Sequence, residues 1–554
     1  MSLAGCRGDA LRRLAEMPFL DRLELAAVSG WSRGAVYQAV SGLEQGGMAQ
    51  AIPHATPLVS PTRRYCLTAA GLGRLAESEG VSPQQLSAHR PVSSSWRRIL
   101  LERLDAVAVI YRVAAALSDA AHPLGFRWYR AASPDAGIQL PGGRTLAVVR
   151  MGNAADRTAF AKRLWRLSQE TRPGAALLLV SDEVRLRQAA RLLDALPLLG
   201  FLALEGDAAR AGAGSPVWRG PPGSAPLSLR EVVALVNPFG ELPAEAAPRP
   251  EPIGANLDLE AAGNAPPSFL LPALLKPSEK RALDLLFDWP WLAPDHLGAL
   301  MGVGQARLHQ VLERLIGLGL AAKPVDGNRR LLALTDVGLA LASRRDRSSV
   351  GVARRRWSVS SLDPQAPSGW RNVSGSRSRQ LLRNLEHTQA VHRFLAALAI
   401  QSPGRGWRIT QLDPPRRATR FFRHDGRLHS VRPDAFGVLQ RDGRNHPFFL
   451  EWERRAVRPS TMAARIAPYL RYFATNHPLD DHGAQPMVLV VFDDELPATH
   501  FLRVAGMEMR RAGVAVPLWV SHRGFLEHAG PLGAAWQSQD AWEPAYAFGP
   551  LVAH

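Results

Sequence analysis

The sequence predicts an α/β protein that is organised as a tandem duplication. In both halves, apolar segments of strand length alternate with segments of helical periodicity, which is typical of a sheet covered by helices. The halves also share an ordered series of matches, which includes a long helix, a Leu-Thr-x-x-Gly sequence, a Pro-Asp-Ala sequence, an apolar strand and a late tryptophan. The helix, for example, reads RLDAVAVIYRVAAAL at 103–117 and NLEHTQAVHRFLAAL at 384–398. Chance explains one such match but not an ordered series, so the chain contains a repeat.

The front of each half, residues 8–80 and 276–345, has three helical patterns followed by a hairpin. In the first half we expect helices over 20–28 and 32–46, with Ser32 as the cap of the second, and a hairpin from 48–52 to 63–67. In the second half we expect helices over 293–301 and 304–317 and a hairpin from 320–325 to 328–334. This order is similar to winged helix-turn-helix domains, whose bacterial members commonly carry Leu-Thr-x-x-Gly after the wing.

The winged-helix resemblance implies DNA binding, with one helix in the groove and basic contacts from the wing. Phosphate contacts come mostly from arginine and similar side chains. Winged helices also serve as protein-docking modules, and this alternative stays open. The residues predicted to contact DNA through these two segments are Arg33, Tyr37, Gln38, Arg63, Arg64, Arg329 and Arg330.

Two stretches are predicted to lie outside the folded domains. Residues 219–275 are rich in Pro, Ala and Gly and read as a linker with one short helix at 229–236. Residues 344–376 are polar and rich in Arg and Ser, and we expect them to be extended.

The back of the second half, residues 377–540, is predicted to be an α/β layer with a mixed central sheet. After the duplicated helix, the expected strands are 407–412, 434–439, 446–452, 487–492 and 514–520, with a hairpin through 418–431 and helices over 461–474 and 498–512. Residues 85–218 are predicted to be a degenerate copy. The second copy is longer by an insertion, mainly at 413–431, which carries Arg420 and Arg423 and is expected to reach towards nucleic acid.

Three acids stand at strand ends in the second copy. Asp434 follows Pro433, and the apolar run 448–450 leads directly into Glu451 and Glu453. Residues two apart in a strand point to the same face, so these carboxylates are expected to converge with that of Asp434. Oxygen ligands of this kind suit Mg²⁺ or Mn²⁺, which can activate water and hold a phosphodiester. The alternative interpretation is a solvated strand end.

The order Pro-Asp, Glu-x-Glu and a following helix resembles the PD-(D/E)-x-K nuclease superfamily, which has the restriction-endonuclease-like fold. Together with the preceding winged helix, residues 276–540 resemble the replication-relaxation family of plasmids and integrative elements, and distantly one class of plasmid-mobilisation relaxases. The resemblance implies a metal-dependent DNA-nicking site with Asp434, Glu451 and Glu453 as catalytic and metal-binding residues. The family lysine is replaced by Glu453, and the candidates to substitute for its charge are Arg454, Arg455 and Arg465.

Several aromatic and ionisable residues near this motif have weaker predicted roles. His387, on the duplicated helix, is interpreted as a packing or polar-network residue, and Tyr469 and Tyr472 as packing residues rather than as covalent attachment points for DNA. In the first half Asp135 remains, but the following strand, 146–151, contains no acid. We therefore expect the first copy to be catalytically inactive.

Composition agrees with a DNA-binding protein. The net charge is +18, and only four of the 67 basic residues are lysines. An excess of positive charge attracts polyanions, and the arginine fork suits phosphate. The expected partners are double-stranded DNA, possible single-stranded DNA and replication or conjugation proteins. Two cysteines and no long apolar run predict a protein of the bacterial cytoplasm, associated with nucleoid or plasmid and not with a membrane. A non-catalytic regulator with a vestigial nuclease fold remains the alternative to a nicking enzyme.

Overall fold

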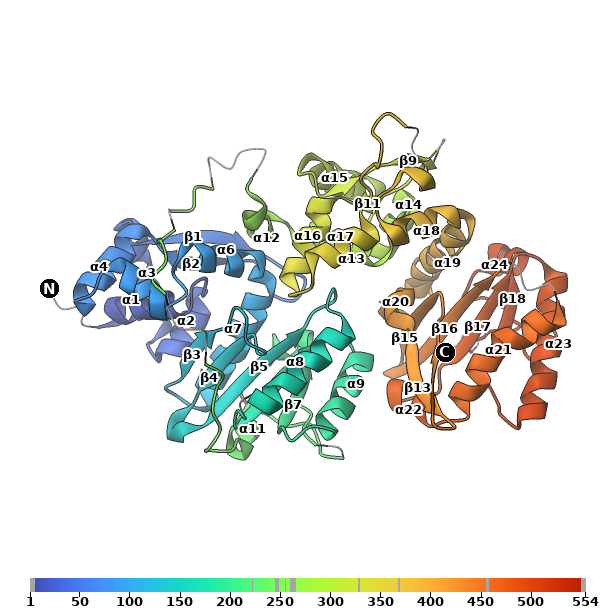
Figure 1. Cartoon of the computed structure of the whole chain (residues 1–554), viewed down its shortest axis with the longest axis horizontal. Helices are drawn as coiled ribbons and strands as arrows, with labels where there is room; N and C mark the ends of the chain where they lie inside the picture. Colours follow the sequence, from blue (N-terminus) through green and yellow to red (C-terminus); the bar gives the residue numbers. More distant parts are fainter. Residues whose placement is uncertain are drawn as a thin grey trace. The chain divides into compact units, whose positions relative to one another are not determined.

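The computed structural model describes residues 5–170, 172–221, 223–244, 249–254, 256–259, 266–326, 329–366, 369–454 and 458–549. For residues 170, 325, 326 and 329 it describes the backbone alone. The chain forms two compact units, coloured along the sequence in Figure 1. Unit 1 comprises residues 1–281, 315–320 and 337–354, and unit 2 comprises residues 282–314, 321–336 and 355–554.

Unit 1 begins with a first helical segment made of three helices, a hairpin and a further helix. These elements are α1 (Cys6–Glu16), α2 (Arg22–Ser29), α3 (Arg33–Gln45), β1 (Ala49–His54), β2 (Thr62–Leu67) and α4 (Ala69–Glu79). A capping box formed by Asp21 and Glu24 begins α2, and Gly30, with a φ of 70°, ends it in the left-handed conformation. The Ser32 side chain accepts a hydrogen bond from the Ala35 backbone N–H, which confirms the predicted cap of α3.

The first sheet follows a helical connection made of α5 (Pro83–His89), α6 (Ser94–Glu102) and α7 (Leu104–Ala120). Its strands are β3 (Gly125–Trp128), β4 (Ala136–Gln139), β5 (Thr145–Met151), β6 (Ala175–Val180) and β7 (Gly200–Leu204), in the order β3-β4-β5-β6-β7. The first two pairs are antiparallel and the last two are parallel. Helices α8 (Arg157–Glu170) and α9 (Glu183–Asp194) connect the parallel strands, and the short helix α10 (Glu205–Ala208) follows β7.

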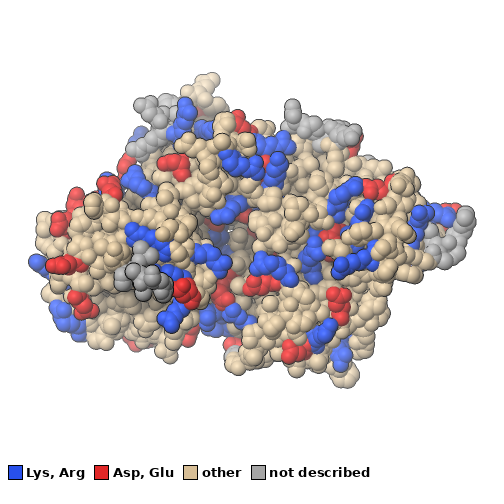
Figure 2. Space-filling model, turned by 180° about the vertical axis from the view of Figure 1, so that it is seen from behind, with Lys and Arg blue, Asp and Glu red and all other residues tan. Residues whose placement is uncertain are grey.

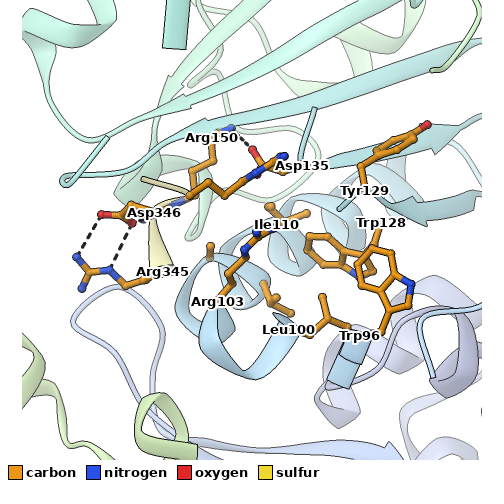
Figure 3. Close-up of a pocket in the computed structure, with 13 residues that line it drawn as sticks. Trp96, Leu100, Arg103, Ile110, Trp128, Tyr129, Asp135, Arg150, Arg345 and Asp346 are labelled. Atoms are coloured by element: carbon orange, nitrogen blue, oxygen red, sulfur yellow. Dashed lines mark hydrogen bonds and ion pairs between the residues drawn. The ribbon is translucent and has the colours of Figure 1, made fainter. Parts of the chain in front are cut away.

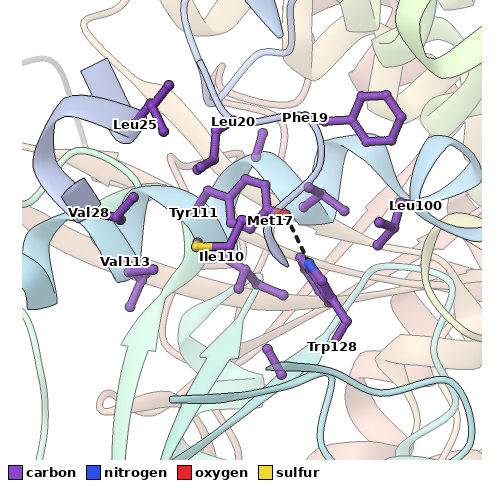
Figure 4. Packing of buried hydrophobic residues seen from close by; sticks show 14 of the residues in the cluster. Met17, Phe19, Leu20, Leu25, Val28, Leu100, Ile110, Tyr111, Val113 and Trp128 are labelled. Carbon is purple, nitrogen blue, oxygen red and sulfur yellow. Dashed lines mark hydrogen bonds between the residues drawn. The ribbon is translucent and has the colours of Figure 1, made fainter. Parts of the chain in front are cut away.

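Alternating strand residues divide the interior of unit 1 into two cores. Leu146, Val148 and their neighbours pack with α7 and with the first helical segment in one cluster. Figure 4 shows part of this cluster, in which the Trp128 indole N–H donates to the Tyr111 hydroxyl over 2.9 Å. Ala147, Val149 and the residues of the same parity pack instead against α8 and α9. The sheet is therefore the middle layer between α7 and the pair α8 and α9.

Part of the stretch predicted as a linker belongs to the fold of unit 1. Helix α11 (Leu229–Leu235) matches the predicted short helix, and its Leu229 and Val232 are buried in the first core. The carboxylate of Glu251 forms an ion pair with Arg130 over 2.6 Å. Short helical turns at η2 (Ser268–Leu270) and α12 (Leu271–Leu274) follow. The stretch 219–275, predicted as a linker with one short helix, therefore belongs in part to the fold of unit 1, because the apolar side chains of α11 are buried there.

A second helical segment repeats the order of the first. It contains α13 (Pro277–Asp288), α14 (Pro294–Met301), α15 (Gln305–Gly317), the two-residue strands β8 (Ala321–Ala322), β9 (Val325–Asp326), β10 (Arg329–Arg330) and β11 (Ala333–Leu334), and α16 (Asp336–Arg345). Its residues are divided between the two units. The stretch 344–376, expected to be extended, contains α17 (Val350–Trp357) and η3 (Trp370–Asn372).

Unit 2 contains the second sheet, preceded by α18 (Ser376–Arg383) and α19 (Leu385–Gly404). The strands β12 (Arg408–Asp413), β15 (Ala435–Arg441), β16 (Arg444–Glu453), β17 (Met487–Phe492) and β18 (Leu518–His522) follow one another in this order across the sheet. Between them come α20 (Pro415–Ala418), β13 (Arg420–His424), β14 (Arg427–Val431), α21 (Pro459–Phe473), α22 (His477–His482) and α23 (Glu495–Ala512), and α24 (Arg523–Ala529) follows β18. The predicted strands and helices of this region are confirmed.

The second sheet has the same order of strand directions as the first. Two antiparallel pairs are followed by two parallel pairs. The two halves differ in the chain segment that connects the first two strands of each sheet. In the second half α20, β13 and β14 come between β12 and β15 in the sequence, whereas β3 leads to β4 without a further strand. Within the described ranges, no helix is both long and apolar enough to span a lipid bilayer.

Candidate active site and DNA-contacting surfaces

The candidate active site lies where β15 begins and β16 ends, in unit 2. Asp434 directly precedes β15, and its backbone N–H donates to the Leu450 carbonyl over 2.9 Å. One oxygen of the Asp434 carboxylate, Oδ2, accepts a hydrogen bond from the Trp452 backbone N–H over 2.8 Å. The other, Oδ1, lies 3.0 Å from Nε2 of His387 in the first turn of α19. The Asp434 side chain is therefore fixed by both strands and by a helix.

Glu451 and Glu453 point to the same face of β16, as the strand period predicts. Both line a small pocket under α21 and α23, together with Arg465, Tyr469 and Phe501. The Tyr469 hydroxyl donates to Glu451 Oε1 over 2.6 Å. The Glu453 side chain is only 9% exposed and forms an ion pair with Arg465 over 2.5 Å. The Arg465 side chain is 57% exposed. The carboxylates of residues 451 and 453 are thus held by different partners on the same helix.

Burial and charge shift the pKa values in this site. Burial, followed by the charge of Asp434, raises the pKa of Glu451 to about 8, against the opposing hydrogen bond from Tyr469. Burial and the neighbouring Glu451 raise the pKa of the Tyr469 hydroxyl far above its usual value. Burial alone would lower the pKa of His387, but the hydrogen bond and charge of Asp434 outweigh it, so this pKa is raised. Burial is therefore the main cause of the raised pKa of Glu451, and the charge of Asp434 adds to it.

The three candidate acids each have a separate side-chain partner, and their convergence on one metal ion stays a prediction. Among the described residues, no group of three or more His, Cys, Asp or Glu side chains is placed to hold a metal ion. The physical reason lies in the partners, since Arg465 binds Glu453 while Tyr469 binds Glu451 and His387 binds Asp434. Asp434 and Glu451 remain close enough for the charge of one to shift the pKa of the other.

The sequence predicts a packing or polar-network role for His387, and its hydrogen bond with Asp434 over 3.0 Å is a polar contact of this kind. Its place in the first turn of α19 did not reveal this contact, because the helix and the Pro-Asp sequence are 47 residues apart. Tyr469 packs as expected, with its ring 6.0 Å from that of Phe449, and also holds Glu451. Tyr472 is fully buried, and its hydroxyl lies 3.2 Å from Asp481, so it is a packing residue.

The corresponding position of the first sheet has the same backbone arrangement. The Asp135 N–H donates to the Val148 carbonyl, and the Arg150 N–H donates to Asp135 Oδ2 over 2.7 Å. This register places Val149 and Met151 where β16 has its two glutamates, and both are buried in the apolar core against α8. Apolar side chains therefore occupy these two positions of the first sheet.

Arginines surround the carboxylate of Asp135. Arg163 of α8 lies 2.7 Å from Oδ2, and Arg347 lies 3.0 Å from Oδ1. Arg347 has a φ of 52°, and three backbone carbonyls besides Asp135 accept hydrogen bonds from its guanidinium. These contacts hold the left-handed backbone in place. The charges of Arg163 and Arg347 keep the pKa of Asp135 well below its usual range despite burial.

A second ion pair extends this network. Arg150 binds Asp346 over 2.7 Å and Glu205 over 2.6 Å. Figure 3 shows Asp135, Arg150, Asp346 and Arg345 around the pocket that Trp96, Trp128 and Arg103 also line. Opposite charges thus fill the position that corresponds to the candidate active site.

The residues predicted to contact DNA differ widely in exposure. Arg33, Tyr37 and Gln38 lie on the exposed face of α3, and Arg63 on β2 is exposed beside Glu44. Arg330 and Arg423 are also exposed, whereas the side chain of Arg329 lies outside the described part of the chain. Figure 2 shows basic side chains spread over one face of the molecule with acidic ones among them.

Two predicted DNA contacts are wrong because the side chains are buried. The Arg64 side chain is completely buried and binds both oxygens of Glu24, over 2.8 and 3.1 Å. Arg420 is 1% exposed and stacks over the ring of Phe436, with its guanidinium carbon 4.6 Å from the ring centroid. Both arginines stabilise the interior, and neither can reach a phosphate at the surface.

The class of protein defined by these observations is an α/β protein with helix-and-hairpin segments and a carboxylate site at the end of a mixed sheet. Residues 299–488 match a family model described as Replication-relaxation. This part of the chain, which contains α15 and all three candidate acids, is therefore similar to the replication-relaxation family, as the sequence motifs predict. No curated protein and no solved structure matches the sequence.

Proposed function

We propose that this is a DNA-binding protein of a mobile genetic element, acting in replication or mobilisation, with a divalent-metal-dependent DNA-nicking site in its second half. In this proposal the two helical segments are winged helices, the two sheets are nuclease-like domains, and the halves arose by duplication. The shared order of strand directions and the common cradle around Asp135 and Asp434 support the duplication. The family match supports the role in replication or mobilisation.

The observation that carries the proposed activity is the arrangement around Asp434. A carboxylate anchored by a backbone N–H and a histidine lies near the partly exposed carboxyl group of Glu451, where β15 begins and β16 ends. Like charges held together in a buried site are stabilised when a cation is bound between them. No such cluster is needed for folding, since the first sheet has apolar side chains at the same positions.

The donor chemistry fits one hard divalent cation held by Asp434 and Glu451. Both provide carboxylate oxygens, the ligand type that Mg²⁺ and Mn²⁺ prefer, and Mg²⁺ commonly binds through one or two carboxylates and keeps several waters. Such an ion would supply Lewis acidity towards a phosphodiester and an activated water. Glu453 is a ligand in this scheme only when Arg465 releases it.

The remaining side chains position these two acids. His387 fixes the orientation of the Asp434 carboxylate through Oδ1, and Tyr469 fixes Glu451 through Oε1. Arg465 is the candidate for charge stabilisation, because its side chain is more than half exposed and can turn from Glu453 to a phosphate. An arginine does not serve as a base at neutral pH, so this role is electrostatic.

A second candidate function is a non-catalytic DNA-binding regulator. The observation that favours it is the ion pair of Glu453 with Arg465, which withdraws the third acid from the site. In this reading the acids are a remnant of a nuclease fold, and DNA binding through the helical segments is the whole activity.

A nicking assay on supercoiled plasmid with Mg²⁺ or Mn²⁺ separates the two functions. Under the proposal, Asp434→Asn and Glu451→Gln abolish nicking and leave duplex affinity unchanged or tighter, because negative charge facing the phosphate is removed. Asp442→Asn is the matched control, since Asp442 is an aspartate 87% exposed at the turn after β15 and its positive φ suits asparagine. Full metal-dependent nicking by Asp434→Asn would refute the site. A wild-type protein that binds duplex DNA but cuts neither duplex nor single strands would establish the regulator.

A further inference from the structure

The hairpin of β13 and β14 lies between β12 and β15 in the chain, whereas among the described residues no strand lies between β3 and β4 of the first sheet. It leaves the sheet after β12 and returns to Asp434, which lies three residues beyond the end of β14. Within the described ranges, its two strands form a separate two-stranded sheet. A hairpin that is not part of the main sheet and that leads directly into the candidate active site is well placed to contact a substrate.

The inner face of this hairpin is packed against the domain. Phe422 is 2% exposed, and its ring lies 5.1 Å from that of Tyr472 on α21. Arg420, on the same face, stacks over Phe436. Tyr472 lies three residues from Tyr469, the residue that holds Glu451. The packing fixes the hairpin to the helix that also supports the acidic site.

The outer face carries exposed apolar side chains between arginines. The strand register pairs Phe421 with Ser430 and Arg423 with Leu428, so these four residues lie on the side opposite Phe422. Phe421 is 50% exposed and Leu428 is 68% exposed.

The charges around this face are mainly positive. Arg423 is exposed on the face itself, and Arg427 is exposed at the turn. Arg432 is also exposed and donates from Nε to Ser430 Oγ over 3.1 Å, which holds its guanidinium beside the outer face. The one acid of the hairpin, Asp425, is 87% exposed at its tip and lies 3.1 Å from His424.

This combination fits a polyanion that exposes flat apolar groups, which is unpaired DNA. In single-stranded DNA the base faces are accessible and stack on aromatic side chains, while arginines follow the backbone. A continuous duplex presents phosphates but keeps its base faces stacked inside, so it leaves Phe421 and Leu428 without a matching surface. The three exposed arginines complement the negative charge of a phosphate backbone. A protein partner of mixed charge does not require this excess of positive charge.

We propose that the outer face of the β13–β14 hairpin binds single-stranded DNA through Phe421, Leu428 and the flanking arginines and leads that strand to Asp434 and Glu451. The inference rests on the proposed function, because it identifies an unpaired strand as the form of substrate that the acidic site receives. A strand lying along β14 passes residues 431–433 and reaches the acids by continuing in the direction of the chain.

The test compares binding of a fluorescent oligothymidylate with binding of a duplex of mixed sequence by fluorescence anisotropy, using the full chain. Phe421→Ala combined with Leu428→Ala is expected to weaken oligothymidylate binding about 5- to 100-fold, the range for loss of base stacking, and to change duplex affinity less than about twofold. Phe421→Trp keeps a stacking surface and is expected to retain wild-type affinity. Leu496→Ala is the matched control, because Leu496 is an apolar residue 66% exposed on α23 of the same unit. Unchanged thermal unfolding of each variant shows that folding is intact.

The outcomes separate this inference from the proposed function. Oligothymidylate affinity that is unchanged in the double variant, while the wild type still binds duplex and nicks plasmid, overturns the hairpin proposal alone. Equal losses for oligothymidylate and duplex also overturn it, since the hairpin is then a general DNA contact. A wild type that binds neither form of DNA removes the proposed function itself. Photocross-linking of an iodouracil oligonucleotide to the peptide that contains Phe421 is the expected positive result.

Discussion

Arg63 and Arg64 are adjacent on β2, yet the structure predicts opposite consequences for their removal. Arg64→Met deletes four hydrogen bonds of the guanidinium, two to Glu24, one to the Phe19 carbonyl and one to His54. The Glu24 carboxyl, which is completely buried, then loses its ion pair with Arg64. Removal of one partner of a buried ion pair costs about 3–5 kcal/mol, a large share of the 5–15 kcal/mol that stabilises a typical domain. We expect the lower end, because Arg112 lies 3.3 Å from Glu24 and supplies some compensation.

Urea unfolding followed by tryptophan fluorescence measures the loss of stability. The double variant Arg64→Met with Glu24→Leu is expected to recover part of it, since no buried charge then remains unpaired. Arg63→Ala is the matched control, because the exposed Arg63 side chain pairs only at the surface with Glu44, and its removal is expected to change stability by less than about 0.5 kcal/mol. An Arg64→Met protein that is as stable as the wild type but binds DNA more weakly would refute the buried assignment.

Three further predictions concern DNA binding, the first sheet and pH. Arg330→Ala is expected to weaken duplex binding for all sequences and to reduce the slope of log affinity against log salt by about 1, measured by anisotropy between about 50 and 200 mM salt; an unchanged slope would exclude a phosphate contact. Asp135→Asn is expected to lower the unfolding midpoint of the first half while plasmid nicking stays at the wild-type rate, because Arg163 and Arg347 lose their shared partner. Burial lowers the pKa of His392 to about 3, so the folded state favours the neutral ring. The stability that depends on the neutral ring is fully present above pH 6.5 and is lost as the pH falls. In denaturant titrations the free energy of unfolding at pH 5 is expected to be about 2 kcal/mol lower than above pH 6.5. His392→Phe should remove this part of the pH dependence.

The elements of the second sheet could be predicted because each follows from local sequence. Apolar runs such as 448–450 and 487–492 have strand length and composition, and the helices show apolar residues at helical spacing. The cap at Ser32 was also local, since the hydrogen bond spans three residues. Boundaries moved by a few residues, as for β18, which begins at Leu518 rather than at 514.

Exposure of the arginines could not be predicted from the same information. Arg63 and Arg64 have the same chemistry and adjacent positions, and the strand period says only that they point to opposite faces. Which face is buried depends on Glu24, forty residues away, and on the core that covers it. Arg420 is similar, because its stacking partner Phe436 belongs to another strand. An arginine count therefore overestimated the number of side chains available to DNA.

Division of the acids among separate partners was also beyond the sequence. The strand period correctly placed Glu451 and Glu453 on one face, but it could not show that α21 contributes Tyr469 to one and Arg465 to the other. The contact of His387 with Asp434 likewise required the packing of α19 near the start of β15. Long-range pairs of this kind are fixed by the tertiary fold and leave no spacing signal.

Comparison of the two sheets explains why one aspartate is a candidate cation ligand and the other is not. Asp135 and Asp434 accept the same backbone hydrogen bond at the same place in the sheet. Two guanidinium groups already neutralise Asp135, so a divalent cation there would face net positive charge. In the described part of the chain, the side chain of His387 is bonded to Asp434, and burial and the charge of Asp434 raise the pKa of the neighbouring Glu451 to about 8. The same backbone hydrogen bond holds the aspartate in both halves. The charge of the neighbouring side chains decides whether that aspartate can attract a metal ion.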